Sequence, residues 1–377
     1  MKFQRFLIRI FGWKYRYIFS KILFRFDSES AHIWCIRMGE RLGAMPGAPR
    51  LVAGMFRFSH PSLRTTLAGI SLETPVGLAA GFDYEARLPR ILPSIGFGWS
   101  TVGTITNEPY AGNPLPRLGR LVKSQSLLVN KGFKNLGIDA TLARLAGIQT
   151  SIPIGISIGM TNTPRITRHE DAVADISAAF KKAEQSSVRF AYYELNISCP
   201  NLRTTVAFYE PKRLETLLAA LDALSLSKPV FIKMPIEKSD AETVAMLRVV
   251  ATHRIAGVII GNLQKDRMHL SLNPAEVARY PKGNFSGAPC RTRSDELVRL
   301  AYREVGEKLA IIGCGGIFTT EDAYRKICLG ASALQLVTGL IFRGPLVPSE
   351  IAVGLAALLK RDGFRTIADA VGIDARN

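Results

Sequence analysis

Polar side chains stand at the ends of three successive apolar runs in the middle of the chain. Asn196 and Cys199 follow the run over residues 190–195, Lys233 lies at the end of the next run, and Asn262 follows the third. Asn carries donors and an acceptor, so a pair of them can bind the edge of a cyclic amide without adding charge. A thiol can take up a proton, and a lysine in an apolar run needs an acceptor, such as the electron-rich edge of a flavin. One asparagine alone could be a turn residue, but the set together favours a site for a ligand.

Glycines follow two further apolar runs near the C-terminus. Gly315 and Gly316 end one of them, and Thr338 with Gly339 ends the other. Backbone N–H groups of glycines can approach an anion, and the last two loops of a (β/α)8 barrel commonly bind phosphate. We predict a phosphate-bearing ligand, although such glycines would also serve tight turns between strand and helix. Small residues at 79–81 would let a flat ring lie against the backbone.

The runs that carry these residues alternate with segments of helical periodicity, as expected for parallel strands joined by helices. Helices are indicated over residues 173–183 and 214–224 by apolar spacing, and after Ser239 and Thr319 by capping boxes. Eight runs qualify as strands: residues 74–79, 97–103, 152–158, 190–195, 229–234, 257–260, 309–312 and 333–337. Eight such units predict an α/β protein with a closed (β/α)8 TIM barrel, whose catalytic residues lie at one rim.

The first 26 residues combine basic and aromatic side chains. Seven Lys and Arg residues and no acid precede Asp27, and they supply more than a third of the net charge of +18. No uncharged run approaches the roughly 20 residues that span a bilayer, and none has the form of a secretory signal. We predict an amphipathic helix that lies in the surface of an anionic membrane. The alternatives are a helix docked on its own domain with a solvated basic face, and a mitochondrial presequence.

A second short helix is indicated over residues 31–42, and a stretch rich in glycine and proline follows at 43–49. We therefore divide the chain into an N-terminal helical segment, residues 1–45, and a barrel domain, residues 46–377. The five cysteines are an odd number without metal-binding spacing, so we expect reduced thiols, no metal and no disulfide framework. The chain lacks an aromatic and basic stripe typical of nucleic-acid binding, so we expect no nucleic-acid partner.

Nearly the whole chain resembles the dihydroorotate dehydrogenases, specifically their membrane-associated, quinone-using class. The similar stretches are residues 23–27 with 31–32, 75–83, 96–98, 103–106, 112–117, 196–201, 286–289, 313–316 and 339–345. The resemblance implies an FMN-dependent enzyme that oxidises (S)-dihydroorotate to orotate in de novo pyrimidine biosynthesis and passes the electrons to a membrane quinone. It also implies that the N-terminal helices form a quinone tunnel, on a peripheral membrane protein that faces the cytoplasm, at the inner membrane in a bacterium.

The resemblance also assigns roles to individual residues. It implies FMN contacts at Ala79, Ala80, Gly81, Thr104, Ser157, Asn196, Lys233, Gly287, Gly315, Gly316, Val337 and Thr338. It implies substrate contacts at Tyr84, Asn130, Asn196, Asn201 and Asn262. Cys199 would be the catalytic base that removes the C5 proton of the ring. A thiol has an ordinary pKa of about 8.5, which would leave a useful thiolate fraction near neutral pH.

Four features depart from the family's pattern. Tyr84 stands where the membrane-bound class usually has a lysine, Leu263 where it has a hydroxyl residue, and Cys199 where it has a serine. The loop over residues 130–135 is one residue shorter. We expect weaker binding of an anionic ring unless another cation, such as Lys131, replaces the missing lysine. Two alternatives follow: an enzyme of the same family acting on another dihydropyrimidine-like ring, and a catalytically silent membrane-surface flavoprotein.

Overall fold

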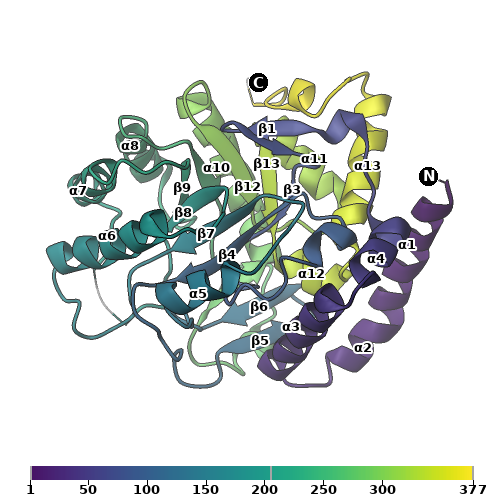
Figure 1. Cartoon of the computed structure of the whole chain (residues 1–377), viewed down its shortest axis with the longest axis horizontal. Coiled ribbons are helices and arrows are strands. Elements are labelled where there is room, and N and C mark those ends of the chain that lie inside the picture. Colours follow the sequence, from purple (N-terminus) through teal and green to yellow (C-terminus); the bar gives the residue numbers. More distant parts are fainter. Residues whose placement is uncertain (1, 204–205, 376–377) are drawn as a thin grey trace.

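The structure, a computed structural model, describes residues 2–203 and 206–375. Within these residues, eight parallel strands close into a barrel in the order β10-β12-β13-β3-β4-β7-β8-β9 (Figure 1). These strands are β3 Val76–Leu78, β4 Trp99–Ile105, β7 Ile154–Ile158, β8 Tyr192–Asn196, β9 Val230–Met234, β10 Gly257–Ile260, β12 Ala310–Cys314 and β13 Ala333–Leu336. Each overlaps one of the eight predicted runs, so the TIM barrel is confirmed.

Helices cover the outside of the barrel, because the connections between parallel strands must return along its outer surface. The longer ones are α5 Ile138–Leu145, α6 His169–Gln185, α7 Pro211–Asp222, α8 Asp240–Val250, α10 Arg291–Val305, α11 Thr320–Cys328 and α13 Val347–Arg361. Shorter ones are α9 Pro274–Val277, α12 Thr338–Arg343, η2 Pro61–Leu63, η3 Leu92–Ile95, η4 Ala288–Cys290 and η5 Ala368–Ala370. Both predicted capping boxes form: Ser239 accepts from the N–H of Glu242, and Thr319 from that of Asp322.

Apolar side chains fill one end of the barrel. Trp99, Tyr192 and Phe231 lie near the starts of their strands and are fully buried. Their rings meet edge to face, with 5.8 Å between the centroids of Trp99 and Tyr192. The hairpin of β1 Thr65–Leu67 and β2 Ile70–Leu72 contributes to the same cluster. This packed floor leaves the opposite end, where the strands finish, for a site.

A second, antiparallel sheet accompanies the barrel and was not predicted. Its strands are β5 Leu118–Leu121, β6 Ser126–Val129 and β11 Asn284–Gly287, in the order β11-β6-β5. The sheet brings together segments that are about 150 residues apart in the chain. Because β5 contacts α3 Ser28–Ala44, the sheet also connects the N-terminal helices to the barrel.

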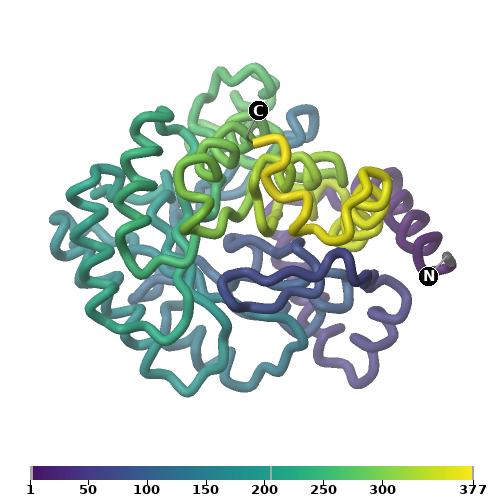
Figure 2. The backbone as a smooth tube through the Cα atoms, turned by 90° about the horizontal axis from the view of Figure 1, so that it is seen from above, coloured from purple at the N-terminus to yellow at the C-terminus, as the bar shows by residue number. Residues whose placement is uncertain are grey.

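The N-terminal residues form a nearly continuous helix beside the C-terminal part of the chain (Figures 1 and 2). It consists of α1 Lys2–Lys14, the π-helical turn η1 Tyr15–Phe19 and α2 Ser20–Leu23. Two further helices follow, α3 and α4 Ala48–Phe56. The helix α3 includes the short helix predicted at 31–42. The helix α4 was not predicted; it begins within the glycine- and proline-rich stretch, with Pro49 in its first turn. No helix in the described part of the chain combines the length and apolarity needed to cross a bilayer.

The first helix is docked firmly on the barrel domain. It packs against α4 and α13, and a Cβ at Gly12 would lie only 1.7 Å from Glu350 Oε1 of α13. Glu350 accepts hydrogen bonds from Arg16 at 2.8 and 2.9 Å, and Tyr15 donates to the backbone oxygen of Ile341 at 2.8 Å. The inner face of this helix is therefore docked on the barrel domain, as one of the alternatives from the sequence expected. Its outer face remains exposed.

Candidate active site

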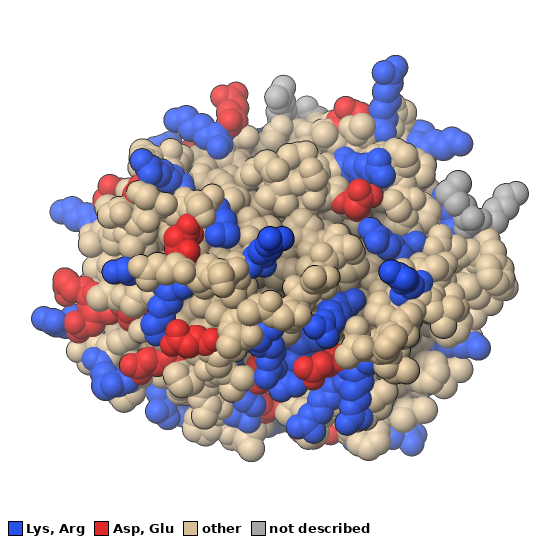
Figure 3. Space-filling model, viewed as in Figure 1, with Lys and Arg blue, Asp and Glu red and all other residues tan. Residues whose placement is uncertain are grey.

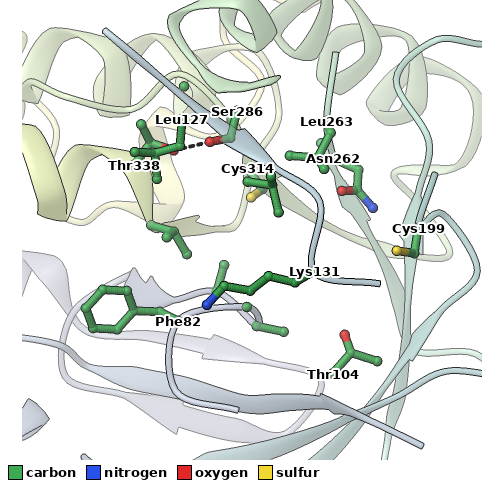
Figure 4. A pocket seen from close by; sticks show the side chains of 18 of the residues that line it. Phe82, Thr104, Leu127, Lys131, Cys199, Asn262, Leu263, Ser286, Cys314 and Thr338 are labelled. Carbon is green, nitrogen blue, oxygen red and sulfur yellow. Dashed lines mark hydrogen bonds between the residues drawn. The ribbon is translucent and has the colours of Figure 1, made fainter. Parts of the chain in front are cut away.

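A pocket lies where the barrel strands end. Thr104, Asn196 and Asn262 line it from the barrel, Ser286 lines it from the antiparallel sheet, and His32 lines it from α3. Figure 4 shows Thr104, Asn262 and Ser286 around one space. The N-terminal helices and the barrel therefore share this pocket.

Most of the predicted site residues line this pocket. They are Ala79, Ala80, Gly81, Tyr84, Thr104, Asn196, Cys199, Asn201, Lys233, Asn262, Gly287, Gly315, Gly316, Val337 and Thr338. Ser157 and Asn130 were predicted to touch the ligands but do not line the pocket. Ser157 is fully buried behind Thr104, with 2.9 Å between their hydroxyl oxygens, and Asn130 accepts a hydrogen bond from Asn113 at 3.1 Å. Ser157 therefore stands one layer behind the surface that a ligand would meet, and the side chain of Asn130 is engaged by Asn113 outside the pocket lining.

Buried hydrogen bonds fix the polar groups at the centre of the barrel. Glu194 Oε1 accepts from Ser157 Oγ at 3.0 Å, and Asn196 Nδ2 donates to Thr104 Oγ1 at 2.8 Å. Lys233 Nζ lies 3.9 Å from Glu194 Oε1. Both charged side chains are buried, so water cannot solvate them, and the attraction between the two opposite charges offsets the free-energy cost of burying each one. Asn196 and Lys233 are thereby held in place at the pocket wall.

Cys199 lies on the loop that follows β8. Asn262 Nδ2 donates to the backbone oxygen of Ser198 at 3.0 Å and so joins this loop to the end of β10. Burial raises the pKa of the Cys199 thiol to about 12, against smaller opposing effects of the Asn201 N–H and two lysines. The expectation of a useful thiolate fraction near neutral pH is therefore wrong, because the sequence offered only the ordinary pKa of an exposed thiol.

Glycines and hydroxyls form another part of the pocket wall. Gly315 and Gly316 follow the β12 strand end with φ values of 102° and 70°. Thr338 begins α12, and its hydroxyl oxygen lies 2.7 Å from that of Ser286 (Figure 4). Backbone turns and hydroxyl groups of this kind can bind an anion such as phosphate.

Gly316→Ala is expected to lower the free energy of unfolding. The left-handed backbone at this position costs an alanine about 1–2 kcal/mol, and a Cβ would lie 2.6 Å from the Cα of Arg291. Chemical denaturation would measure the loss. Gly54→Ala in α4 is the control, because a Cβ there meets nothing within 4 Å and alanine favours a helix by about 0.5–1 kcal/mol. Equal stability of the two variants would contradict this explanation.

His32 is a lining residue to which no role was assigned from the sequence. Burial lowers its pKa to about 3, so the ring is neutral. Its Nε2 lies 2.9 Å from the backbone oxygen of Phe82 and must donate to it, while Nδ1 has no partner among the described residues. The pair Ala31-His32 belongs to a similar stretch noted above, but no local pattern reveals that α3 lies across from the end of β3.

Comparisons with known proteins agree with this architecture. The family model described as dihydroorotate dehydrogenase matches residues 62–359. A dihydroorotate dehydrogenase (quinone) from Thermobifida fusca is 36% identical over 370 residues, which are 96% of each chain. One from Natronomonas pharaonis is 36% identical over 358 residues, covering 93% of this chain and 97% of the relative. The solved structure of ligand-free DHODH from Eimeria tenella has a TM-score of 0.82 and 27% identity, covering 93% of this chain and 100% of that one.

Proposed function

The chain belongs to the dihydroorotate dehydrogenase family, and we propose that it oxidises (S)-dihydroorotate to orotate and passes the electrons to a membrane quinone. This reaction is a step of pyrimidine biosynthesis. The observation that carries the proposal is the grouping of Asn196, Cys199 and Asn262 in one pocket with a lysine, Lys233, held beside Glu194. The same grouping argues against a catalytically silent flavoprotein, which would have no use for it.

FMN is the proposed cofactor, because the pocket suits both its ring and its phosphate. A Cβ at Gly81 would meet open space, so a flat ring can lie against the backbone of residues 79–81. Gly316 and Thr338 would bind the phosphate through backbone N–H groups and a hydroxyl. Lys233 would stabilise negative charge at the ring edge. When bound, FMN would accept two electrons and one proton from the substrate, together equivalent to a hydride.

The chain's own residues would orient the substrate and take one proton. Asn196, Asn201 and Asn262 offer amide donors and acceptors that match the edge of a cyclic urea. Cys199 Sγ would accept the proton that leaves ring C5. Because burial raises the pKa of this thiol, its basic form is a minority near neutral pH and increases as the pH rises.

A second candidate substrate is a dihydropyrimidine without a carboxylate. Leu263 supports it, because this side chain gives the pocket an apolar wall next to Asn262. An apolar wall favours neither a charge nor a hydrogen-bonding substituent at that point of the ring.

A peripheral position on the cytoplasmic face of a membrane, the inner membrane in a bacterium, is the proposed location. Phe3, Phe6 and Trp13 are exposed on the outer face of α1. Figure 3 shows Lys and Arg side chains gathered on the lower part of one face, where α3 and β5 lie in Figure 1. The helix α1 also carries Lys and Arg residues of its own. Exposed aromatics and cations on one helix are suited to the surface of an anionic membrane.

Purified protein is expected to be yellow, with one FMN per chain, and to lose its visible flavin absorbance when mixed anaerobically with dihydroorotate. Spectra of the protein before and after mixing, and of the supernatant after heating, would measure both. Bleaching by dihydrouracil but not by dihydroorotate would support the second candidate. Colourless protein that takes up no added FMN would contradict the flavin proposal.

A further inference from the structure

Lys131 is an unusual cation in the pocket wall. Lys134 Nζ lies 3.2 Å from a carboxylate oxygen of Glu29, and Lys233 Nζ lies 3.9 Å from one of Glu194. Lys131 has no carboxylate partner within ion-pair distance in the described part of the chain, although it also lines the pocket and is only 9% exposed. The pocket therefore contains a buried positive charge that the protein leaves without a direct counterion.

The ammonium group of Lys131 is held by Tyr84. Lys131 Nζ donates a hydrogen bond to Tyr84 Oη at 2.9 Å and lies 4.5 Å from the centroid of the tyrosine ring. Figure 4 shows the Lys131 side chain extending across the pocket. Burial is the main cause that lowers the pKa of Lys131 to about 8; Glu29 opposes this shift, and Lys134 and Arg117 add to it. A bound anion would restore the charged form and remove the cost of burying it.

The backbone on either side of Lys131 is fixed by asparagines. Asn113 N–H donates to the Lys131 backbone oxygen at 3.3 Å, and Asn162 Nδ2 donates to that of Gly132 at 3.0 Å. A Cβ at Gly132 would lie within 2.6–2.8 Å of the two asparagine side chains. The loop therefore presents the lysine from a constrained position.

We propose that Lys131 binds the carboxylate of the substrate, and that Tyr84 is a positioning residue that holds the ammonium group in the pocket. This inference rests on the proposed function, since it requires an anionic ring as substrate. It makes Lys131 the residue that distinguishes dihydroorotate from the same ring without a carboxylate. It also means that the lysine missing at position 84 is replaced from the shortened loop.

The test compares the binding of orotate and of uracil, which has a closely similar ring without the carboxylate, to the FMN-loaded protein by calorimetry. Lys131→Gln is expected to weaken orotate binding about 10- to 100-fold, the range for a lost charge-assisted hydrogen bond, and to leave uracil binding and FMN content unchanged. Lys134→Gln removes the same charge from the same loop, but its ammonium already faces Glu29, so we expect less than about a threefold change. Tyr84→Lys added to Lys131→Gln should recover most of the lost affinity, because the two side chains end only 2.9 Å apart and a lysine at position 84 would return a cation to this part of the pocket.

The outcomes separate this inference from the proposed function. If the unaltered protein binds uracil but not orotate, the proposed substrate is wrong. If it binds orotate and Lys131→Gln binds orotate equally well, the function stands and the role of Lys131 is excluded. Loss of FMN from Lys131→Gln, or an equal loss of affinity for orotate and for uracil, would show that Lys131 stabilises the pocket as a whole and does not bind the carboxylate.

Discussion

Cys199→Ala is expected to slow the formation of orotate about 10²- to 10⁴-fold, the usual cost of removing a general base. The C5 proton of the ring is weakly acidic, and Cys199 is the side chain on the loop after β8 that can take it up. Binding of FMN and of orotate should persist, because the asparagines and Lys233 are unchanged. Single-turnover mixing with dihydroorotate would measure the rate.

Cys328→Ala is the matched control for this variant. Cys328 is a buried cysteine whose pKa is likewise raised by burial, but it lies in α11 and does not line the pocket. We expect its rate to remain within about twofold of the original, as for a substitution away from the reacting atoms. A rate near the original for Cys199→Ala at neutral pH would exclude Cys199 from the mechanism.

The pH dependence of the same rate follows from the buried thiol. A base works only after losing its proton, and the pKa of Cys199 is raised to about 12. The rate should therefore rise about tenfold per pH unit from neutral pH upwards, without levelling off where an exposed thiol of pKa about 8.5 would. A plateau just above pH 8.5 would indicate that substrate binding returns the thiol to its ordinary pKa.

The second large effect is expected at the membrane. Removing residues 1–26 should abolish flotation of the protein with vesicles of phosphatidylcholine and phosphatidylglycerol at low salt. The deletion removes seven cations, one of which, Arg16, faces Glu350. Each of the others that reaches an anionic surface contributes about 1 kcal/mol. The deletion also removes the exposed aromatics of α1, among them Phe3 at 72% and Phe6 at 57% exposure. Sedimentation or flotation with and without added salt would measure the change.

A second variant keeps the helix docked on the barrel. Its loss of vesicle binding could not be explained by misfolding of a truncated chain. Phe6→Ser combined with Trp13→Ser removes two side chains that are more than half exposed, so the contacts with α13 remain. We expect at least about a tenfold loss of vesicle affinity, given about 1.5–3 kcal/mol for each large apolar side chain fully buried. Leu270→Ser is the control, because Leu270 is fully exposed and lies outside the N-terminal helix. Equal flotation of all variants would contradict the membrane proposal.

The barrel could be predicted from the sequence because each of its strands is buried on both faces. Such strands appear as short continuous apolar runs, and the run over 257–260 coincides with β10. The antiparallel sheet carries no comparable signal: β5 has four residues that alternate in burial, and β11 is distant in sequence from its partner β6. The pairing of β11 with β6 joins segments far apart in the chain, and the hydrophobic periodicity within one segment does not reveal it.

The site was predicted less completely than the fold, for a similar reason. Residue types and strand ends indicated Asn196, Cys199 and Asn262, which do line one pocket. Whether a side chain faces the pocket or stands behind it depends on tertiary packing, and this is where Ser157 and Asn130 differ from expectation. The pKa of Cys199 is likewise a property of burial, which one sequence does not reveal.

The apolar floor made by Trp99, Tyr192 and Phe231 fills the end of the barrel opposite the pocket. If Cys199 takes up a proton, these rings and the β1–β2 hairpin would block its path along the barrel axis. It would return to water past the rim, beside the loop that carries Cys199 and that Asn262 joins to β10. This loop thus lies along the route by which the proton would be discharged after each turnover.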